Sequence, residues 1–192
     1  MLWNVQTFAA TTTTLLILGD SLSAGHRMNV SQSWPTLLQE KLPNVRIINA
    51  SSSGETSSGG VRRLPGLLAK YHPNWCFLEL GGNDGLQGLA PKFLKTQLTK
   101  MIQQASQAQC HVILSEIKIP PNYGKRYTES FNQVYHQLAH QFKLPLMPFF
   151  VEPIYQQKGM MQADGIHPSV KAQPVIANEV AKFLKPIMAE RK

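Results

Sequence analysis

The sequence predicts an α/β protein with a flavodoxin-like, three-layer α/β/α architecture and a five-stranded parallel sheet. Short apolar runs alternate along the chain with stretches of helical spacing, which is the pattern of β-α-β units joined by right-handed crossovers. Five such runs suit a doubly wound sheet of strand order 2-1-3-4-5. The 192 residues are 43% hydrophobic and contain no long biased segment, so we expect one domain, residues 1–192.

The expected strands are apolar runs that end at turn residues. The first, residues 15–18, contains four consecutive aliphatic residues and leads directly into Gly19-Asp20-Ser21. Such a run is typical of a strand buried on both faces. The remaining expected strands are residues 45–50, 75–80, 111–117 and 144–150.

The expected helices lie between and after these strands. Ser33 is the expected N-cap of the first helix, with Pro35 in its opening turn. Pro65 interrupts an otherwise regular spacing of apolar residues in the second, and Pro168 suits the first turn of the last. The expected helices span residues 34–41, 61–71, 91–108, 128–142 and 169–188.

A net charge of +8 raises the question of nucleic-acid or lipid-surface binding. The basic residues are scattered, however, with only short pairs at Arg62-Arg63 and Lys125-Arg126, and no aromatic-interleaved RNA-binding motif is present. We therefore expect a solvated basic surface and no nucleic-acid partner. No run of 18 apolar residues occurs, so we also expect no stable membrane insertion.

The two cysteines and the first ten residues bear on the compartment. Cys76 and Cys110 have neither C-x-x-C nor zinc-site spacing, and each adjoins an expected strand. We expect buried free thiols there, with a disulfide between neighbouring strands as the alternative. Residues 1–10 lack the positive region and the full apolar region of a signal peptide, and predict a flexible tail or a signal remnant.

Three expected strands end in loops that carry chemically useful groups. Ser21, Gly54 and Asn83 follow the first, second and third strands. Ligands of open α/β sheets bind at this edge. An acyl-transfer hydrolase needs a nucleophile there, with donors for the oxyanion. A glycine N–H and an asparagine amide are suitable donors.

A base and its orienting carboxylate occur together near the end of the chain. His167 can take a serine proton, and Asp164, three residues earlier, can reach its ring within one turn. Each of these residues is also common in ordinary turns. Their joint occurrence with Ser21 favours catalysis, and this chemistry needs neither a metal nor an organic cofactor.

These motifs resemble the SGNH, or GDSL-type, hydrolase superfamily. The first block is Gly19-Asp20-Ser21-Leu22-Ser23, the second-block glycine is Gly54, the third block is Gly81-Gly82-Asn83-Asp84, and the fifth is Asp164-Gly165-Ile166-His167. The resemblance covers roughly residues 14–186. Residues 122–127 and 145–150 are most similar to bacterial periplasmic members that act as thioesterases and lysophospholipases.

The resemblance implies a serine esterase or thioesterase that works through an acyl-enzyme on Ser21. His167 and Asp164 would complete the triad, and the Ser21 N–H, Gly54 and Asn83 would form the oxyanion hole. The implied substrates are small acyl esters and thioesters such as acyl-CoA, lysophospholipids and aryl esters. A periplasmic or secreted location is also implied, although no complete signal peptide is present. We expect a monomer, because nothing in the sequence requires more than one chain.

Candidates for an acyl-chain groove come from two loops, with ordinary loop packing as the alternative. They are Leu86, Leu89, Ile119, Pro120 and Tyr123. Gly85 and Gly88 would allow the first of these loops to move as a lid. Asp20 is expected either to orient the Ser21 loop or to serve as a plain helix cap.

Other functions fit the sequence less well. A nucleotide-binding module on the same fold would need a phosphate-binding G-x-x-x-x-G-K-[ST] loop, which is absent. A lipid- or carbohydrate-binding relative without catalysis would be expected to lack Ser21 or His167, and both are present. His136 and His140 lie four residues apart, but no H-E-x-x-H motif includes them, so we expect exposed helix histidines and no metal site.

Overall fold

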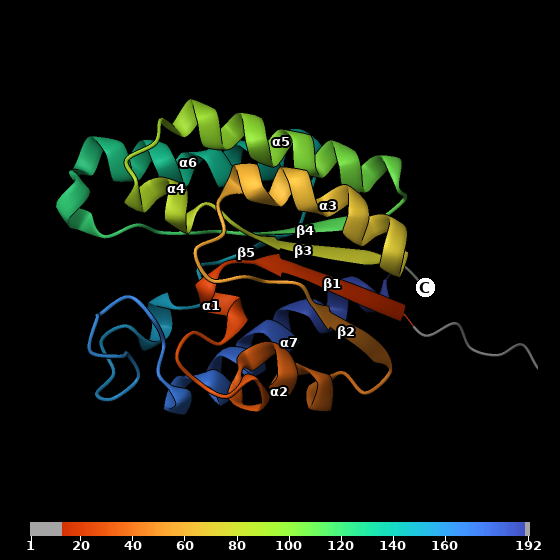
Figure 1. Cartoon of the computed structure of the whole chain (residues 1–192), viewed down its shortest axis with the longest axis horizontal. Coiled ribbons are helices and arrows are strands. Elements are labelled where there is room, and N and C mark those ends of the chain that lie inside the picture. Colours follow the sequence, from red (N-terminus) through yellow and green to blue (C-terminus); the bar gives the residue numbers. More distant parts are fainter. Residues whose placement is uncertain (1–12, 191–192) are drawn as a thin grey trace, which may run out of the picture.

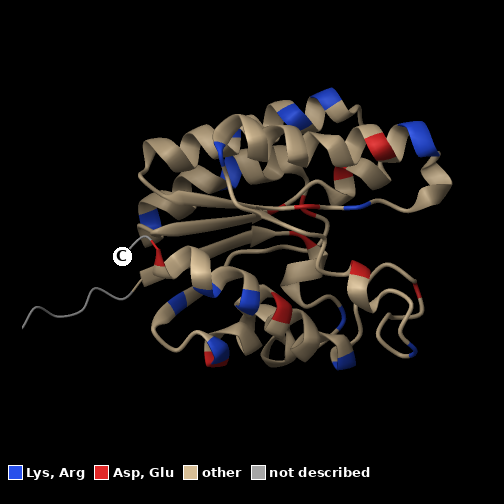
Figure 2. Ribbon diagram, turned by 180° about the vertical axis from the view of Figure 1, so that it is seen from behind, with Lys and Arg blue, Asp and Glu red and all other residues tan. Residues whose placement is uncertain are grey.

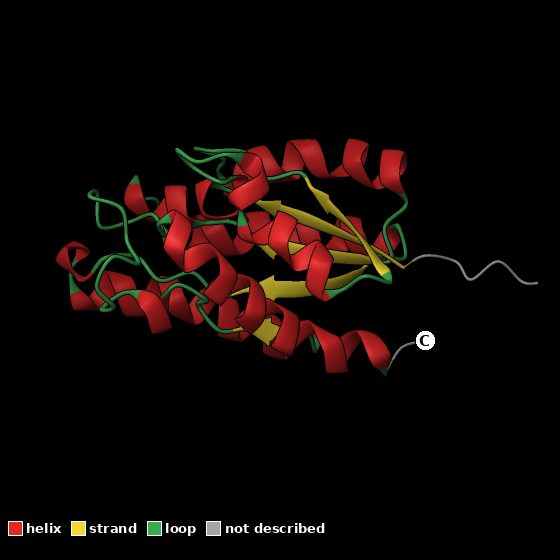
Figure 3. Ribbon diagram, turned by 90° about the horizontal axis from the view of Figure 1, so that it is seen from below, coloured by secondary structure: helices red, strands yellow, loops and turns green. Residues whose placement is uncertain are grey.

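A parallel sheet with helices on both faces forms the centre of the molecule (Figure 1, Figure 3). The structure is a computed structural model that describes residues 13–190. Its five strands are ordered β2-β1-β3-β4-β5. The predicted three-layer fold and strand order are thus confirmed. The expectation for residues 1–10 falls outside the described residues.

β1 lies inside the sheet, and its position follows from its sequence. The side chains of residues 15–18 are completely buried, because helices cover both faces of the sheet. In register, Leu15 lies beside Ile47 of β2 and Trp75 of β3. The strands are β1 (Thr13–Gly19), β2 (Val45–Asn49), β3 (Trp75–Glu79), β4 (His111–Ser115) and β5 (Leu146–Met147).

The last two strands are shorter than the sequence predicts. β5 has two residues where residues 144–150 were expected, and it lies between Pro145 and Pro148. Proline has no N–H to donate to a neighbouring strand, which limits pairing on either side. β4 likewise ends at Ser115 instead of residue 117.

Two groups of helices cover the sheet (Figure 1). One face carries α3 (Ser57–Tyr71), α4 (Gly82–Leu86), α5 (Pro91–Gln107) and α6 (Lys125–Phe142). The other carries α2 (Trp34–Lys41) and α7 (Gln173–Ala189). Short segments complete the described chain: α1 (Ser21–Ala24), η1 (Val30–Gln32), η2 (Pro121–Tyr123), η3 (Glu152–Ile154) and η4 (Val170–Ala172).

The helix α3 begins four residues before the predicted start, and Pro65 lies inside it. Its N-cap is Thr56, whose side chain accepts a hydrogen bond from the Gly59 N–H at 3.2 Å. Proline cannot donate to the carbonyl four residues earlier, which here belongs to Val61. The side chain of Gln104 donates to that oxygen instead, at 3.3 Å. A neighbouring helix therefore compensates for the lost bond.

Other helix starts also differ from the prediction. Ser33 is at the N-cap of α2, but its hydroxyl donates to the Val30 carbonyl at 2.7 Å and does not cap the helix. α6 begins three residues early, at Lys125. α7 begins four residues late, because Pro168 pairs with Met161 in an isolated antiparallel bridge and is not in a helical turn.

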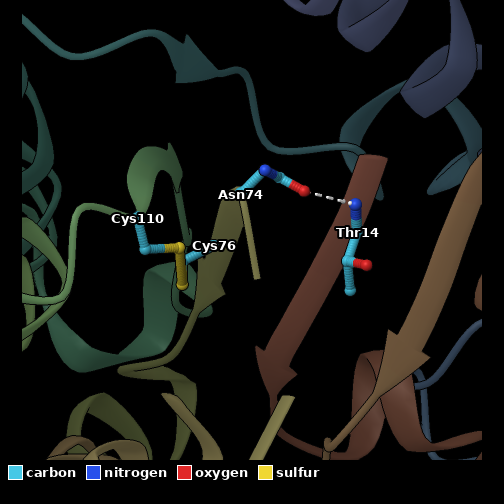
Figure 4. Close-up of a disulfide and its surroundings, with 4 residues drawn as sticks. All are labelled: Thr14, Asn74, Cys76 and Cys110. Atoms are coloured by element: carbon cyan, nitrogen blue, oxygen red, sulfur yellow. Dashed lines mark hydrogen bonds between the residues drawn. A yellow bond between two sulfur atoms is a disulfide. The ribbon is translucent and has the colours of Figure 1, made fainter. Parts of the chain in front are cut away.

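A disulfide joins Cys76 of β3 to Cys110, one residue before β4 (Figure 4). The expectation of free thiols was therefore wrong. Because β3 and β4 are parallel neighbours, with Trp75 in register with His111, the two Cα atoms come within 6.2 Å. That separation is within the range that a disulfide spans. The predicted strand order already made β3 and β4 neighbours, and the alternative of a disulfide between neighbouring strands was the correct one.

Charged residues are spread over the helices on both sides of the sheet (Figure 2). Basic positions occur in both helical layers, which agrees with the expectation of a solvated basic surface. Within residues 13–190, none of the helices combines the length and the apolar character that crossing a membrane requires.

Candidate active site

A pocket of about 630 Å³ opens at the carboxyl ends of the central strands. Ser21, Gly54, Asn83 and His167 all line it. These residues come from four separate loops, and the parallel arrangement of the strands brings the first three to one edge of the sheet.

Ser21 lies at the start of the short helix α1, directly after β1. The Asp20 carboxylate caps this helix by accepting the Leu22 N–H at 3.0 Å. A Cβ at Gly19 would crowd the buried side chains of Glu79 and Ser23, so any larger residue would require them to move. Ser21 is thereby held in a tight strand-to-helix turn.

Three side chains form a continuous chain of hydrogen bonds. His167 Nε2 lies 2.8 Å from the Ser21 hydroxyl, and His167 Nδ1 lies 2.9 Å from Asp164 Oδ2. Serine, histidine and aspartate connected in this order are the arrangement of a serine-hydrolase triad. The structure therefore brings together the three residues that the sequence indicated.

Local hydrogen bonds favour the ionised form of the Asp164 carboxyl. Burial opposes its charge, but the backbone N–H groups of His167 and Ile166 donate to Oδ1 at 3.0 and 2.9 Å. These bonds, together with the His167 ring, hold the pKa of the Asp164 carboxyl well below its usual range. Gly165 completes the turn with a φ of 68°, a left-handed conformation that favours glycine.

The loop that carries His167 is held by hydrogen bonds and has little buried surface. The Gln162 side chain donates to the His26 and Pro168 carbonyls, each at 3.0 Å. The Tyr155 hydroxyl donates to the Gly165 carbonyl at 2.7 Å. These contacts set the distance between His167 and Ser21.

The expected oxyanion donors lie on the other side of Ser21. Asn83, the second residue of α4, donates its side-chain N–H groups to the Glu55 carbonyl at 2.9 Å and to Asp20 Oδ2 at 3.3 Å. Gly54 has a φ of 78°, and no atom lies within 4 Å of where a Cβ would be. Backbone conformation, and not lack of space, therefore favours glycine there.

Arg63 and Asp84 hold the loop between β2 and α3. The Arg63 guanidinium donates to Glu55 Oε2 and to the Ala50 carbonyl, each at 2.6 Å. The buried Asp84 carboxylate accepts the Ser57 N–H at 2.8 Å and also the Ser57 hydroxyl. These contacts connect the loop that carries Gly54 to the helix that carries Asn83.

A buried pair of acids lies beneath Ser21, and the sequence analysis missed one of them. Glu79 Oε2 accepts the Ser23 hydroxyl at 2.6 Å and the Asp20 N–H at 3.4 Å. Burial raises the pKa of Asp20 to about 7 and raises that of Glu79 well above its usual value. A glutamate inside an otherwise apolar strand, parallel to the strand that ends at Asp20, is the signal that could have identified it.

The structure separates the five candidates for an acyl-chain groove. Leu86, Ile119 and Pro120 line the pocket, whereas Leu89 and Tyr123 lie outside it. The Tyr123 hydroxyl donates to the Leu86 carbonyl at 2.8 Å, so this residue braces the loop. The apolar residues of the pocket that were not among these candidates are Leu22, Ile117, Pro121, Phe149, Pro153 and Ile166.

The two glycines expected to mobilise the loop have different surroundings. Gly85 is buried, and a Cβ there would collide with Ile119 and lie 3.0 Å from Phe131. Gly85 therefore serves close packing and is not placed as a hinge. Gly88, with a φ of 70° and open space around it, keeps the conformation that suits a mobile loop.

One group of side chains in the described residues has the composition of a metal site. His26, Asp164 and His167 offer ligand atoms within 4.8 Å of one another. Both ring nitrogens of His167 are already engaged, one with Asp164 and the other with Ser21. An ion bound to this group would therefore have to displace one of these contacts. His136, on α6, instead lies 2.9 Å from Glu116.

Comparison with known proteins places these features in a family. Residues 17–173 match the family described as "GDSL-like Lipase/Acylhydrolase family". The chain is 48% identical over 181 residues to "Thioesterase 1/protease 1/lysophospholipase L1" of Escherichia coli K12, covering 94% of this chain and 87% of that protein. It is 49% identical over 179 residues to "Esterase TesA" of Pseudomonas aeruginosa PAO1, covering 91% of this chain and 89% of that one.

Solved structures agree with this assignment. The psychrotrophic esterase EstA of Pseudoalteromonas sp., inhibited by monoethylphosphonate, superimposes with a TM-score of 0.90 at 41% identity, over 92% of this chain and 99% of that one. A crystal structure of TesA gives a TM-score of 0.86 at 49% identity, over 91% and 99% of the two chains.

Proposed function

The chain belongs to the GDSL-like lipase/acylhydrolase family, and on this premise we propose that it hydrolyses acyl esters and thioesters through an acyl-enzyme on Ser21. The observation that carries the proposal is the chain of hydrogen bonds from Ser21 through His167 to Asp164. Relatives named thioesterase, esterase and arylesterase support the same reaction class.

In the acylation step, the Ser21 hydroxyl attacks the substrate carbonyl while His167 Nε2 removes its proton. A serine hydroxyl is almost un-ionised at neutral pH, so the base 2.8 Å away is essential. Asp164 holds the ring in the correct tautomer and stabilises the imidazolium. His167 then gives the proton to the leaving oxygen or sulfur.

The oxyanion of the tetrahedral intermediate is bound by the Ser21 N–H, the Gly54 N–H and the Asn83 amide. In the resting structure one Asn83 N–H contacts Asp20 Oδ2 at a long 3.3 Å, while the other donates to the Glu55 carbonyl at 2.9 Å. The weaker contact is the one that yields to the oxyanion, which is the better acceptor. Deacylation repeats these steps with water, activated by His167, as the nucleophile.

The pocket favours an apolar acyl group. Leu86, Ile117, Ile119 and Phe149 line it, and burial of apolar surface contributes roughly 25 cal/mol per Å². The names of the relatives give the substrate classes to examine, namely thioesters, lysophospholipids and aryl esters. A catalytically weak lipid- or carbohydrate-binding module on this fold is the alternative, which the intact triad does not favour.

Turnover of p-nitrophenyl esters and acyl-CoA thioesters of increasing chain length tests the proposal. We expect Ser21→Ala to lose at least about 1,000-fold in kcat, while Ser106→Ala, an exposed serine on α5, retains wild-type activity. A wild-type protein inactive on both series, or an active Ser21→Ala variant, would exclude the acyl-enzyme mechanism.

The location of the protein is a separate part of the proposal. The Cys76–Cys110 disulfide supports an oxidising compartment such as the periplasm or the extracellular space, because cytosolic thiols are kept reduced. We expect protein isolated from periplasmic fractions to resist thiol alkylation until a reductant is added. Two alkylatable thiols in the freshly isolated protein would contradict this location. Function as a monomer is consistent with a site built within one chain, and sedimentation analysis tests it.

A further inference from the structure

His26 stacks on the catalytic imidazole, although the mechanism described above gives it no role. The two ring centroids are 4.1 Å apart and the ring planes are 26° from parallel. His26 follows α1 after Gly25, and the Gln162 side chain holds its carbonyl. Its ring lines the pocket next to His167.

We propose that His26 is a positioning residue, whose neutral ring supports one face of His167 and stabilises the imidazolium formed during proton transfer. This inference rests on the proposed function, because it concerns the same proton transfer. Hydrogen bonds to Ser21 and Asp164 restrain two nitrogen atoms of the His167 ring. The stacked ring adds a restraint on the face, which these in-plane bonds do not supply.

The charge on His26 decides whether this contact helps or hinders catalysis. The face of a neutral aromatic ring attracts a cation, so neutral His26 favours the imidazolium. A protonated His26 would instead place a like charge about 4 Å away. Burial, His167 and Arg27 all lower the pKa of His26, while Asp164 acts in the opposite direction. The net lowering favours the neutral form of the His26 ring.

The experiment compares His26→Ala, His26→Phe and wild type, with His140→Gln on α6 as the matched histidine control. We expect His26→Ala to lower kcat by about 3- to 10-fold with a smaller change in KM, since a ring contact of this kind is modest. His26→Phe keeps a ring and should recover much of that loss. The control His140→Gln should match wild type in both kcat and KM.

A proton resonance of the His167 Nδ1–H, which donates to Asp164, provides a second readout. We expect it to broaden or shift in His26→Ala and to persist in His26→Phe, because the ring contact orders the imidazole. Unchanged kcat and resonance in His26→Ala would overturn the proposal, and so would an effect confined to KM. These outcomes leave the requirement for Ser21 intact, so they are distinct from failure of the proposed function. If His26→Ala does not fold, His26→Gln, which also removes the aromatic ring, replaces it in both measurements.

Discussion

The proposed catalytic centre has a serine side and a histidine side, which are built in different ways. The serine side comprises Asp20, Ser21, Ser23, Glu79 and Asn83, and the histidine side comprises Asp164, His167 and the loop that carries them. The serine side rests on buried long-range contacts: Asp20, Ser23 and Glu79 are all at most 2% exposed, and partners lie 56–63 residues apart in sequence. On the histidine side, the contact between Asp164 and His167 spans three residues, and Asp164 lies in an exposed turn. Burial therefore organises one side and local hydrogen bonding the other.

The two sides also shift carboxyl pKa values in opposite directions. Burial raises the pKa of Asp20 and Glu79, whereas hydrogen bonds from the Ile166 and His167 backbone outweigh burial and lower that of Asp164. Acids of the serine side tend to be neutral, and the acid of the histidine side is charged. The same residue type serves structure in one place and catalysis in the other because its surroundings differ.

The largest effect is expected on the histidine side, from Asp164→Asn. The asparagine oxygen can still accept the two backbone N–H groups, but its amide would donate to His167 Nδ1 and favour the wrong tautomer. We expect kcat to fall by about 1,000- to 10,000-fold, with little change in the free energy of unfolding. Ester turnover and urea unfolding measure the two quantities. A loss of kcat below tenfold would show that the negative charge of Asp164 is not needed for turnover.

On the serine side, Asn83→Ala removes one oxyanion donor and leaves the others. We expect kcat to fall by about 100- to 1,000-fold with a smaller change in KM, because the donor acts mainly in the transition state. Steady-state kinetics on one p-nitrophenyl ester separates the two constants. A change confined to KM would mean that Asn83 binds the ground state instead.

The buried acids give the serine side a characteristic pH dependence of stability. Their raised pKa values mean that the folded state binds more protons than the unfolded state between about pH 4 and pH 7, so stability falls as the pH rises through this range. We expect Glu79→Gln to reduce the pH slope of the free energy of unfolding by up to about 1.4 kcal/mol per pH unit. Urea unfolding across that range measures the slope.

Glu40→Gln, an exposed position on α2, is the matched control and should retain the wild-type slope. If Glu79→Gln also keeps that slope, Glu79 does not take up a proton on folding. The raised carboxyl pKa of the serine side would then be a property of Asp20 alone.

The smallest effect is expected where the histidine loop contacts its neighbour. Tyr155→Phe removes the hydrogen bond to the Gly165 carbonyl, which should lower kcat by about 2- to 5-fold because a single neutral bond contributes little. Tyr71→Phe, on α3, controls for loss of a tyrosine hydroxyl. If Tyr155→Phe lowers kcat more than Asn83→Ala does, the Tyr155 hydrogen bond is more important for turnover than the Asn83 side-chain amide.

Much of the fold could be predicted because its signals are local. Five apolar runs that alternate with helical stretches predicted the doubly wound sheet and its strand order. The loops after successive strands then predicted which candidate residues would meet at one edge of the sheet. The start of α3 at residue 57 was missed, since its cap is Thr56 and small residues fill its first turn. The short β5 follows from its flanking prolines, which sequence reasoning did not weigh.

The missed features depend on contacts between distant segments. The predicted strand order made β3 and β4 neighbours, but bonding of Cys76 to Cys110 also depends on the register of the two strands, which their spacing does not show. The stacking of His26 on His167 joins segments about 140 residues apart, and no pattern within either segment indicates it. Leu89 and Tyr123 were expected in the pocket because they are apolar or aromatic, yet their direction is set by tertiary packing.

The place of the triad along the chain has a consequence for biosynthesis. Ser21 follows the first strand, but Asp164 and His167 follow the fifth, and α7 comes later still. The Trp34 N–H donates to the Gln173 side chain at 2.9 Å, so this contact of α2 also waits until α7 has been made. A chain still emerging from the ribosome therefore carries its nucleophile without a base. Hydrolysis begins only after the whole sheet has been translated.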